Sequence, residues 1–219
     1  MNAQSKPAEA RAAVDHLLLG VADLDYGIAW VERTTGVKAV RGGSHPGAGT
    51  RNALVSLGGR QYLEIIAPDP AQTSYNFQMD LRGLSEPRLI TWAAKTARID
   101  AVAKTAREAG YQLAGPRDGS RARPDGKILR WRSLRVGYET GNRAVEVIPF
   151  FIEWAPGSLH PSQDSPPGCE LQGLEFEHPD PAGVTAILKR FGLTMSGRES
   201  KSPRLRAALK TPKGLVEIT

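Results

Sequence analysis

Three glutamates stand between apolar neighbours, in the segments Leu63-Glu64-Ile65, Val145-Glu146-Val147 and Val216-Glu217-Ile218. Side chains alternate across a strand, and both faces of the strand expected at residues 62–67 are mostly apolar, so Glu64 is not expected on an open solvated face. Glu146 repeats this pattern. A partly buried carboxylate must be paired, protonated or metal-bound, because leaving it charged and alone costs several kcal/mol. We therefore expect acid–base or ligand chemistry from Glu64 and Glu146.

Each of these glutamates closes one of three segments with the same expected order of elements, β-α-β-β-β. Every segment brackets one short helix between an aspartate and a glycine, at Asp23 to Gly36, Asp100 to Gly110 and Asp180 to Gly192. An aspartate accepts from free N–H groups of a first turn, and a glycine suits the turn that ends a helix. The expected strands lie at residues 14–21, 52–57 and 62–66, then 89–94, 128–136 and 144–152, and finally 171–177, 193–196, 205–209 and 215–218.

Glycine-rich and polar stretches separate these strands. Gly58-Gly59 predicts a tight hairpin between two strands of the first segment. Residues 42–49 predict a flexible bend, because this stretch lacks the Gly-Lys-Ser/Thr ending of a phosphate-binding loop and a strand follows it. Residues 115–126 are polar and basic and predict a loop.

The repeat defines the expected domain organisation of the 219 residues, a length that allows one large domain or two small ones. We expect a mobile tail at residues 1–12, a domain at 13–154 with modules 13–67 and 88–154, a linker at 155–168 rich in Pro and Ser, and a third module at 169–219.

Composition narrows the class of protein. Cys169 is the only cysteine, which excludes an intramolecular disulfide and a cysteine-based zinc cluster. No apolar run approaches the ~20 residues that span a bilayer, and the first residues do not read as a signal peptide, so we expect a cytoplasmic protein with no membrane partner. The net charge of +6 raises the question of a polyanion partner. The basic stretches at 117–135 and 189–213 lack interleaved aromatics, so we expect solvated faces rather than a nucleic-acid site.

The opening motif His16-Leu17-Leu18-Leu19-Gly20-Val21-Ala22-Asp23-Leu24 and the modular order resemble the vicinal oxygen chelate superfamily, more narrowly its glyoxalase-like members. Two further stretches resemble the glyoxalase-like subgroup: Tyr62-Leu63-Glu64-Ile65-Ile66-Ala67-Pro68, and Phe150-Phe151-Ile152-Glu153-Trp154 followed by His160-Pro161-Ser162. The resemblance implies an α+β fold in which two β-α-β-β-β modules form a cup, with a third, partial module beside it.

The resemblance also implies a metal site. His16, Glu64 and Glu146 match family ligand positions, and the fourth position falls near Thr91, which is not a usual metal ligand. One imidazole and two carboxylates suit Zn²⁺, Mn²⁺, Ni²⁺ or Fe²⁺, which would polarise vicinal oxygens of a substrate. The alternative is a metal-free cup in which His16 pairs with a carboxylate and the polar cluster only binds a ligand.

Residues expected to contact the ligand surround the same cup. They are His45, Arg51 and Asn52 beside the glycine-rich bend, Thr91 and Trp92 in the strand that opens the second module, and Phe150, Trp154 and His160 near the cavity mouth. Aromatic side chains at the mouth of an apolar cavity commonly hold a small organic ligand.

Together these features predict a glyoxalase-like protein that binds a small carbonyl- or oxygen-rich molecule. If it is catalytic, the expected chemistry is metal-dependent lyase or isomerase chemistry, with Glu64 or Glu146 moving a proton. The alternative, from a different class, is a non-catalytic protein that sequesters a drug or toxin, as antibiotic-resistance members of the superfamily do.

The third module predicts an interface, because the first two modules can pair within the chain and leave it one uncovered sheet face. That face would expose Leu174, Phe176, Leu205, Ala207 and Leu209. An apolar patch of this kind marks an interaction surface, and a two-fold homodimer is the simplest way to close it. The alternative is a third module that folds back on its own chain.

Overall fold

The computed structural model describes residues 8–123, 125–137 and 145–219. Its main feature is an eight-stranded sheet with the order β3-β4-β5-β2-β6-β9-β8-β7. The strands are β2 (Val14–Gly20), β3 (Val40–His45), β4 (Thr50–Ser56), β5 (Tyr62–Pro68), β6 (Arg88–Lys95), β7 (Leu113–Ala122), β8 (Ile128–Val136) and β9 (Phe150–Trp154).

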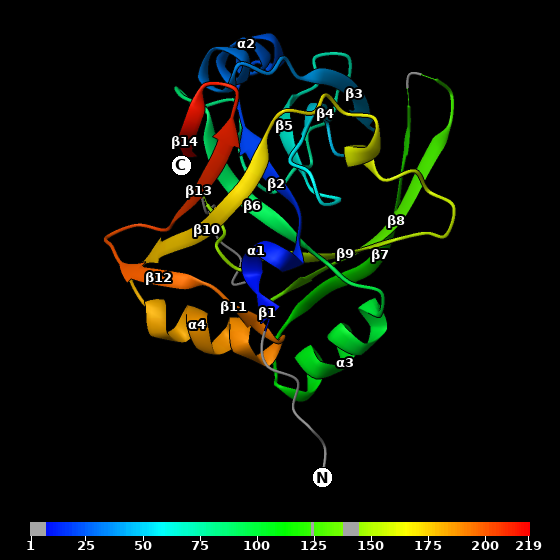
Figure 1. Ribbon diagram of the computed structural model, residues 1–219. Helices are drawn as coiled ribbons and strands as arrows, with labels where there is room; N and C mark the ends of the chain where they lie inside the picture. The colour runs from blue at the N-terminus through cyan, green and yellow to red at the C-terminus, as the bar shows by residue number, and fades with distance from the viewer. Residues whose placement is uncertain (1–7, 124, 138–144) are drawn as a thin grey trace.

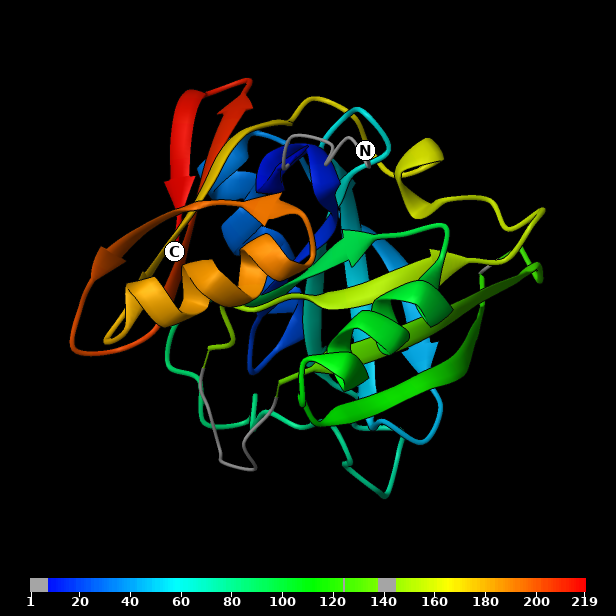
Figure 2. The same ribbon diagram turned by 90° about the horizontal axis from the view of Figure 1, so that it is seen from below.

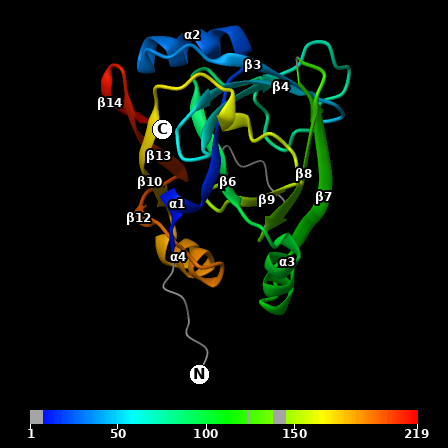
Figure 3. The same ribbon diagram turned by 45° about the vertical axis from the view of Figure 1, so that its right-hand side comes forward.

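This sheet curls so that its two edge strands, β3 and β7, approach each other (Figure 3). Strands β2 and β6, one from each of the first two units, pair antiparallel at the centre. Alternation along β2 gives the sheet two different faces: Leu17 and Leu19 enter the larger core on the outside of the curl, whereas Leu18 belongs to a smaller apolar cluster on the inside. The predicted α+β fold, with two units forming a cup, is confirmed.

Helices cover the outside of the curl (Figure 1), and they lie in the parts of the chain where the sequence predicted them. The first, α2 (Leu24–Thr35), begins at Asp23, whose carboxylate accepts from the Tyr26 N–H at 2.8 Å, and ends at Gly36 in the left-handed conformation. Helix α3 (Ile99–Glu108) packs against β7, β8 and β9. Within the described part of the chain, no helix is both long enough and apolar enough to cross a membrane.

Two sequence expectations in the second unit are wrong. The stretch expected to be a loop at 115–126 is mostly the edge strand β7, whose polar character reflects its exposed outer side. The strand expected at 144–152, whose first residue lies outside the described residues, begins only at Phe150 and runs to Trp154. Glu146 therefore precedes the closing strand, and its N–H makes a bond of 2.7 Å to the Ile90 carbonyl.

The third unit forms a separate four-stranded sheet with the order β12-β10-β13-β14, beside the curled sheet and on the side away from β7 and β8 (Figures 1 and 2). Its elements are β10 (Glu170–His178), α4 (Pro181–Arg190), β11 (Leu193–Thr194), β12 (Ser196–Glu199), β13 (Arg204–Thr211) and β14 (Gly214–Ile218). Residues 1–7 of the expected tail lie outside the described residues, and β1 (Ala8–Glu9) and α1 (Ala10–Ala13) follow them.

The apolar face of the third unit is covered by its own chain. Phe176, Leu205, Ala207 and Leu209 are fully buried, Leu174 is nearly so, and all five belong to the same core as the outer face of the curled sheet. The exposed patch on which the homodimer was predicted is therefore absent from the described residues, because the third unit finds its partner within the chain. The domain boundaries expected from the sequence stay a prediction.

Candidate functional site

A cavity of about 490 Å³ opens on the inside of the curled sheet. Its chemically active lining residues come from four strands: His16 of β2, His45 of β3, Glu64 of β5 and Arg121 of β7. The apolar part of the wall is formed by Leu18, Ile66, Phe77, Trp131, Phe150, Ile152 and Trp154. Asp118 and Arg135 also line the cavity, so charged side chains of both signs stand in a partly apolar wall, as in many small-molecule sites.

Asp15 lies behind His16 and holds it in place. The register of β2 against β6 shifts between Val14 and His16, and both Asp15 and His16 are buried. The Asp15 carboxylate lies 2.8 Å from Nδ1 of His16, and its other oxygen accepts from Nε1 of Trp154 at 3.0 Å and lies 3.1 Å from Nε2 of His160. Three ring nitrogens therefore converge on one carboxylate.

These contacts fix the charge of Asp15 and the orientation of both imidazoles. Burial alone would raise the pKa of Asp15, but the hydrogen bonds from His16 and His160 outweigh it and hold the pKa well below its ordinary value. An ionised carboxylate only accepts, so we assign the proton of His16 to Nδ1. Nε2 of His16 is then directed to the opposite side, where it lies 3.4 Å from Oε2 of Glu64.

Glu64 is buried at the cavity wall with three polar neighbours. Its Oε1 accepts from Nδ2 of Asn52 at 2.6 Å and lies 3.6 Å from Nε2 of His45. Burial acts to raise the pKa of Glu64, but the neighbouring imidazoles of His45 and His16, the Asn52 hydrogen bond and the charge of Arg121 outweigh it, so the pKa is lowered. Glu64 is therefore ionised at neutral pH and holds the form that accepts a proton.

His45 and Tyr62 complete the polar end. Nδ1 of His45 lies 2.9 Å from Oγ1 of Thr50, and burial lowers the pKa of His45, so this imidazole is neutral at neutral pH. The Tyr62 ring stacks on His16 with centroids 4.5 Å apart. Burial and the nearby charge of Glu64 raise the pKa of Tyr62 well above its ordinary value, so its hydroxyl remains a donor.

The structure brings together some of the residues expected to bind the ligand. His45, Asn52, Phe150 and Trp154 line the cavity with His16 and Glu64. Three others take different positions in the described chain: Thr91 and Trp92 are fully buried in the sheet, and His160 supports Asp15 from behind. Arg51, partly buried on β4, is also not among the cavity-lining residues. The functional roles of all these residues stay predictions.

Glu146 does not join Glu64 at this cavity. It lines a different depression with His178 and Asp180 of the third unit, and its Oε2 lies 3.6 Å from Nη1 of Arg135. The strand that closes the second unit, β9, faces the cavity with Phe150, Ile152 and Trp154, none of which is an acid. The ligand set expected from the resemblance is therefore incomplete, and among the described residues no three His, Cys, Asp or Glu side chains are arranged to hold a metal ion.

The sequence predicted no site role for Asp15, Tyr62 or Arg121. Asp15 directly precedes His16 in an apolar strand, and a buried acid beside a histidine was a signal for a hydrogen-bonded pair. Arg121 is nearly fully buried and lines the cavity, although it lies in the stretch expected to be a solvated loop. No local signal identifies it, because its burial depends on the approach of β7 to β3.

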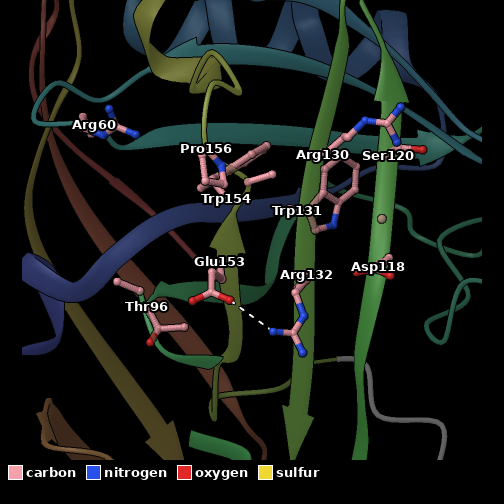
Figure 4. A pocket seen from close by; sticks show the side chains of 13 residues that line it. Arg60, Thr96, Asp118, Ser120, Arg130, Trp131, Arg132, Glu153, Trp154 and Pro156 are labelled. Atoms are coloured by element: carbon pink, nitrogen blue, oxygen red, sulfur yellow. Dashed lines mark hydrogen bonds and ion pairs between the residues drawn. The ribbon is translucent and has the colours of Figure 1, made fainter. Parts of the chain in front are cut away.

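A second, larger depression of about 810 Å³ adjoins the cavity through residues 118–120, Trp131 and Trp154. Figure 4 shows Trp131 and Trp154 in this groove, with Glu153 joined to Arg132. Glu153 also accepts from the Ile99 N–H at the start of α3, so its carboxylate has structural partners. We place the candidate site in the inner cavity, because the buried acid–base cluster opens there.

Two repeated units curl one sheet around an internal polar cluster, as the resemblance to the vicinal oxygen chelate superfamily implied. The family described as "Glyoxalase-like domain" matches residues 14–192, and the chain belongs to this family. A comparison with curated protein sequences gives no match.

Two solved structures are similar to this chain, and the first shares its fold. A hypothetical protein from Staphylococcus aureus superposes with a TM-score of 0.64 at 16% identity, covering 93% of this chain and 83% of that chain. Methylmalonyl-CoA epimerase from Mycobacterium tuberculosis is similar at 22% identity with a TM-score of 0.48, over 71% of this chain and 94% of that chain.

Proposed function

We propose that this protein binds a small carbonyl-bearing molecule in the inner cavity and moves a proton at the carbon next to the carbonyl, as a lyase or isomerase does. The observation that supports this proposal is the buried chain Asp15–His16–Glu64, which ends at the cavity wall. A buried carboxylate, backed by an oriented imidazole, is an arrangement typical of general acid–base catalysis.

In the proposed step, the Glu64 carboxylate takes the proton from the substrate carbon, and the electron pair of the C–H bond moves into the carbonyl to form an enolate. The proton can pass from Oε2 of Glu64 to Nε2 of His16, because Nε2 carries the free lone pair while Nδ1 donates to Asp15. Asp15 then stabilises the imidazolium. Return of the proton, to the same carbon or to a neighbouring one, restores both side chains.

The remaining lining residues suit the other needs of this reaction. The hydroxyl of Tyr62 stays protonated and can donate to the developing enolate oxygen. The apolar wall excludes water from the carbanion-like intermediate and binds the rest of a small molecule.

A divalent metal is not part of this proposal, because the residues expected to hold one do not fit. Glu146 is not among the cavity-lining residues, so the predicted set of three ligands is not assembled there. Of the predicted ligands, His16 and Glu64 alone face each other at the cavity. Zn²⁺, Mn²⁺, Ni²⁺ and Fe²⁺ are added in the experiment below to test whether the reaction needs a metal.

The test is proton exchange at carbon. Pyruvate, 2-oxobutyrate, hydroxyacetone and butanone are incubated with the protein in D₂O, and loss of the α-hydrogen signal is followed by proton NMR. We expect the wild type to accelerate exchange of at least one compound. Glu64→Gln should reduce that acceleration by about 100-fold or more, because an amide cannot accept the proton.

Glu32→Gln is the matched control, since Glu32 is exposed on α2 and outside the cavity; its exchange rate should equal that of the wild type. Exchange should also persist after chelation. Loss of exchange on chelation, with recovery on adding one of the four metals, would contradict the metal-independent step. Binding of the compounds without exchange would instead support the alternative of a non-catalytic binding protein.

A further inference from the structure

Arg121 is a buried charge at the cavity wall that the proposed proton transfer does not use. Its side chain comes from the edge strand β7, is 5% exposed, and lines the cavity that Glu64 and His16 also line. A guanidinium remains charged at all physiological pH values, so it cannot avoid the cost of burial by losing its proton.

No carboxylate of the described residues pairs with this guanidinium. Its Nη1 is buried without a hydrogen-bond partner, and none of the ion pairs in the described chain includes Arg121. Arg206, by contrast, contacts both Glu177 and Glu217. A buried charge without an ion-pair partner is unfavourable, so a site that retains one is preorganised for a ligand of opposite charge.

The neighbouring strand makes room for the guanidinium and offers it no partner. A Cβ at Gly42 or Gly43 would lie 3.0 or 3.1 Å from Nη1 of Arg121, and at Gly43 it would also lie 2.9 Å from the Ala122 carbonyl oxygen. The two glycines of β3 therefore allow β7 to approach closely enough to bury Arg121. The glycine-rich stretch therefore allows two strands to pack closely, a role that the sequence alone did not indicate.

We propose that Arg121 binds the carboxylate of the ligand, so that the cavity selects small 2-oxo acids among carbonyl compounds. This inference rests on the proposed function for the carbonyl group and adds the class of substrate. The planar guanidinium fork matches the two oxygens of a carboxylate.

Charge around the cavity also fixes the direction of the bound acid. Among the charged lining residues, Glu64 and Asp118 repel a second carboxylate. Arg135 already contacts Glu146, whereas Arg121 attracts the carboxylate and has no ion-pair partner among the described residues. A 2-oxo acid is therefore oriented with its carboxylate on Arg121 and its carbonyl end toward Glu64. The cavity volume of about 490 Å³ and its aromatic wall leave room for a phenyl-sized group.

The test separates binding from catalysis by using a probe that has no α-hydrogen. Benzoylformate and its methyl ester differ in the carboxylate charge and share the ketone and the ring. Isothermal titration calorimetry should show that the wild type binds the acid about 10- to 100-fold more tightly than the ester, as expected for a charge-assisted hydrogen bond. Arg121→Gln should lose that preference and keep its affinity for the ester, and Arg121→Lys should retain part of the preference.

Arg117→Gln is the matched control, because Arg117 is exposed on the same strand and outside the cavity; it should bind both probes as the wild type does. The midpoint of thermal unfolding gives a readout independent of ligand. Arg121→Gln should unfold at the same temperature as the wild type or higher, since no ion pair among the described residues is lost. A large decrease would assign Arg121 a structural role and overturn the proposal.

Three binding results would also overturn it: equal affinity of the wild type for acid and ester, unchanged acid binding by Arg121→Gln, or no binding of the acid at millimolar concentration. Inorganic phosphate is the second anion, and binding as tight as that of the acid would show a general anion site. Failure of the proton transfer is distinguishable, because it would leave the Arg121-dependent binding of benzoylformate intact.

Discussion

At the scale of single residues, the site depends on Asp15, which is not itself one of the cavity-lining residues. Its carboxylate contacts the adjacent His16 and joins it to Trp154 and His160, which lie about 140 residues further along the chain. Each of these contacts is charge-assisted, and such bonds are stronger than neutral ones. Asp15 thereby couples the stability of the cup to the orientation of the proton-handling imidazole.

Asp15→Asn should destabilise the protein by about 2–4 kcal/mol at neutral pH, because an amide places a donor where three N–H groups converge. The pH dependence follows from the lowered pKa of Asp15. The folded pKa lies below the unfolded value of about 3.9, so the ionised form stabilises the fold above about pH 4, and this contribution is lost as the pH falls toward the folded pKa. The difference between wild type and variant should therefore narrow below about pH 4 in urea unfolding.

Asp80→Asn is the control for this measurement, since Asp80 is exposed and its ion pair with Arg82 lies at the surface, where such pairs contribute little. Its unfolding free energy should stay close to that of the wild type. A difference between Asp15→Asn and the wild type that is equally large at neutral and acid pH would show that packing, rather than the charge of Asp15, carries the effect.

At the scale of elements, local signals in the sequence were sufficient for most of the fold. Apolar runs predicted β2 and β5, and the Asp23 cap with Gly36 predicted α2, because caps and periodicity act within a few residues. Glu146 was misplaced because Val145-Glu146-Val147 has the alternation of a strand, yet β6 pairs with residues 150–152 instead. Pairing partner and register are long-range properties, and a shift of register changes which residues face the cavity.

The same limit explains why the candidate site was predicted only in part. His16 and Glu64 were found because each stands out in an apolar strand. Arg121 was not found, because its burial is decided by the closing of the sheet rather than by its own segment. The contact between strands β3 and β7 therefore decides whether Arg121 is buried at the cavity, and a substitution at this contact tests it.

Gly43→Ala should separate these two edge strands. The new Cβ would lie 2.9 Å from the Ala122 carbonyl oxygen, which is backbone and cannot rotate away. We expect a loss of about 1–3 kcal/mol of unfolding free energy, as for overpacking elsewhere, and weaker binding of benzoylformate because Arg121 is displaced. Chemical denaturation and calorimetry measure the two effects.

Gly83→Ala is the matched control for Gly43→Ala, because a Cβ there meets no atom within 4 Å. This variant should be as stable as the wild type or slightly more stable, since alanine restricts the unfolded chain. If Gly43→Ala behaves like Gly83→Ala in both measurements, the close contact of β3 and β7 does not shape the site.

At the scale of the whole molecule, the third unit packs against the outside of the curled sheet and shares its core. Its Phe191 packs on Phe151 of β9 with ring centroids 5.2 Å apart, and the Leu89 N–H donates to the Thr219 carbonyl at 3.0 Å. One continuous core runs from the outer face of the curled sheet into the four-stranded sheet. The two sheets should therefore unfold together.

Phe176→Ala tests this cooperativity from the third unit. Phe176 is fully buried on β10, and truncating a buried phenylalanine costs about 3–5 kcal/mol. All four tryptophans lie between residues 30 and 154, so their fluorescence reports on the cup alone, whereas far-ultraviolet circular dichroism reports on the whole chain. We expect Phe176→Ala to lower the urea midpoint equally by both probes, because coincident transitions are the mark of a single cooperative unit.

Leu215→Ala, at a 75% exposed position of the same sheet, should leave both midpoints unchanged. An unchanged fluorescence midpoint in Phe176→Ala, with an early transition by circular dichroism, would mean that the third unit unfolds alone and that the cup stands without it.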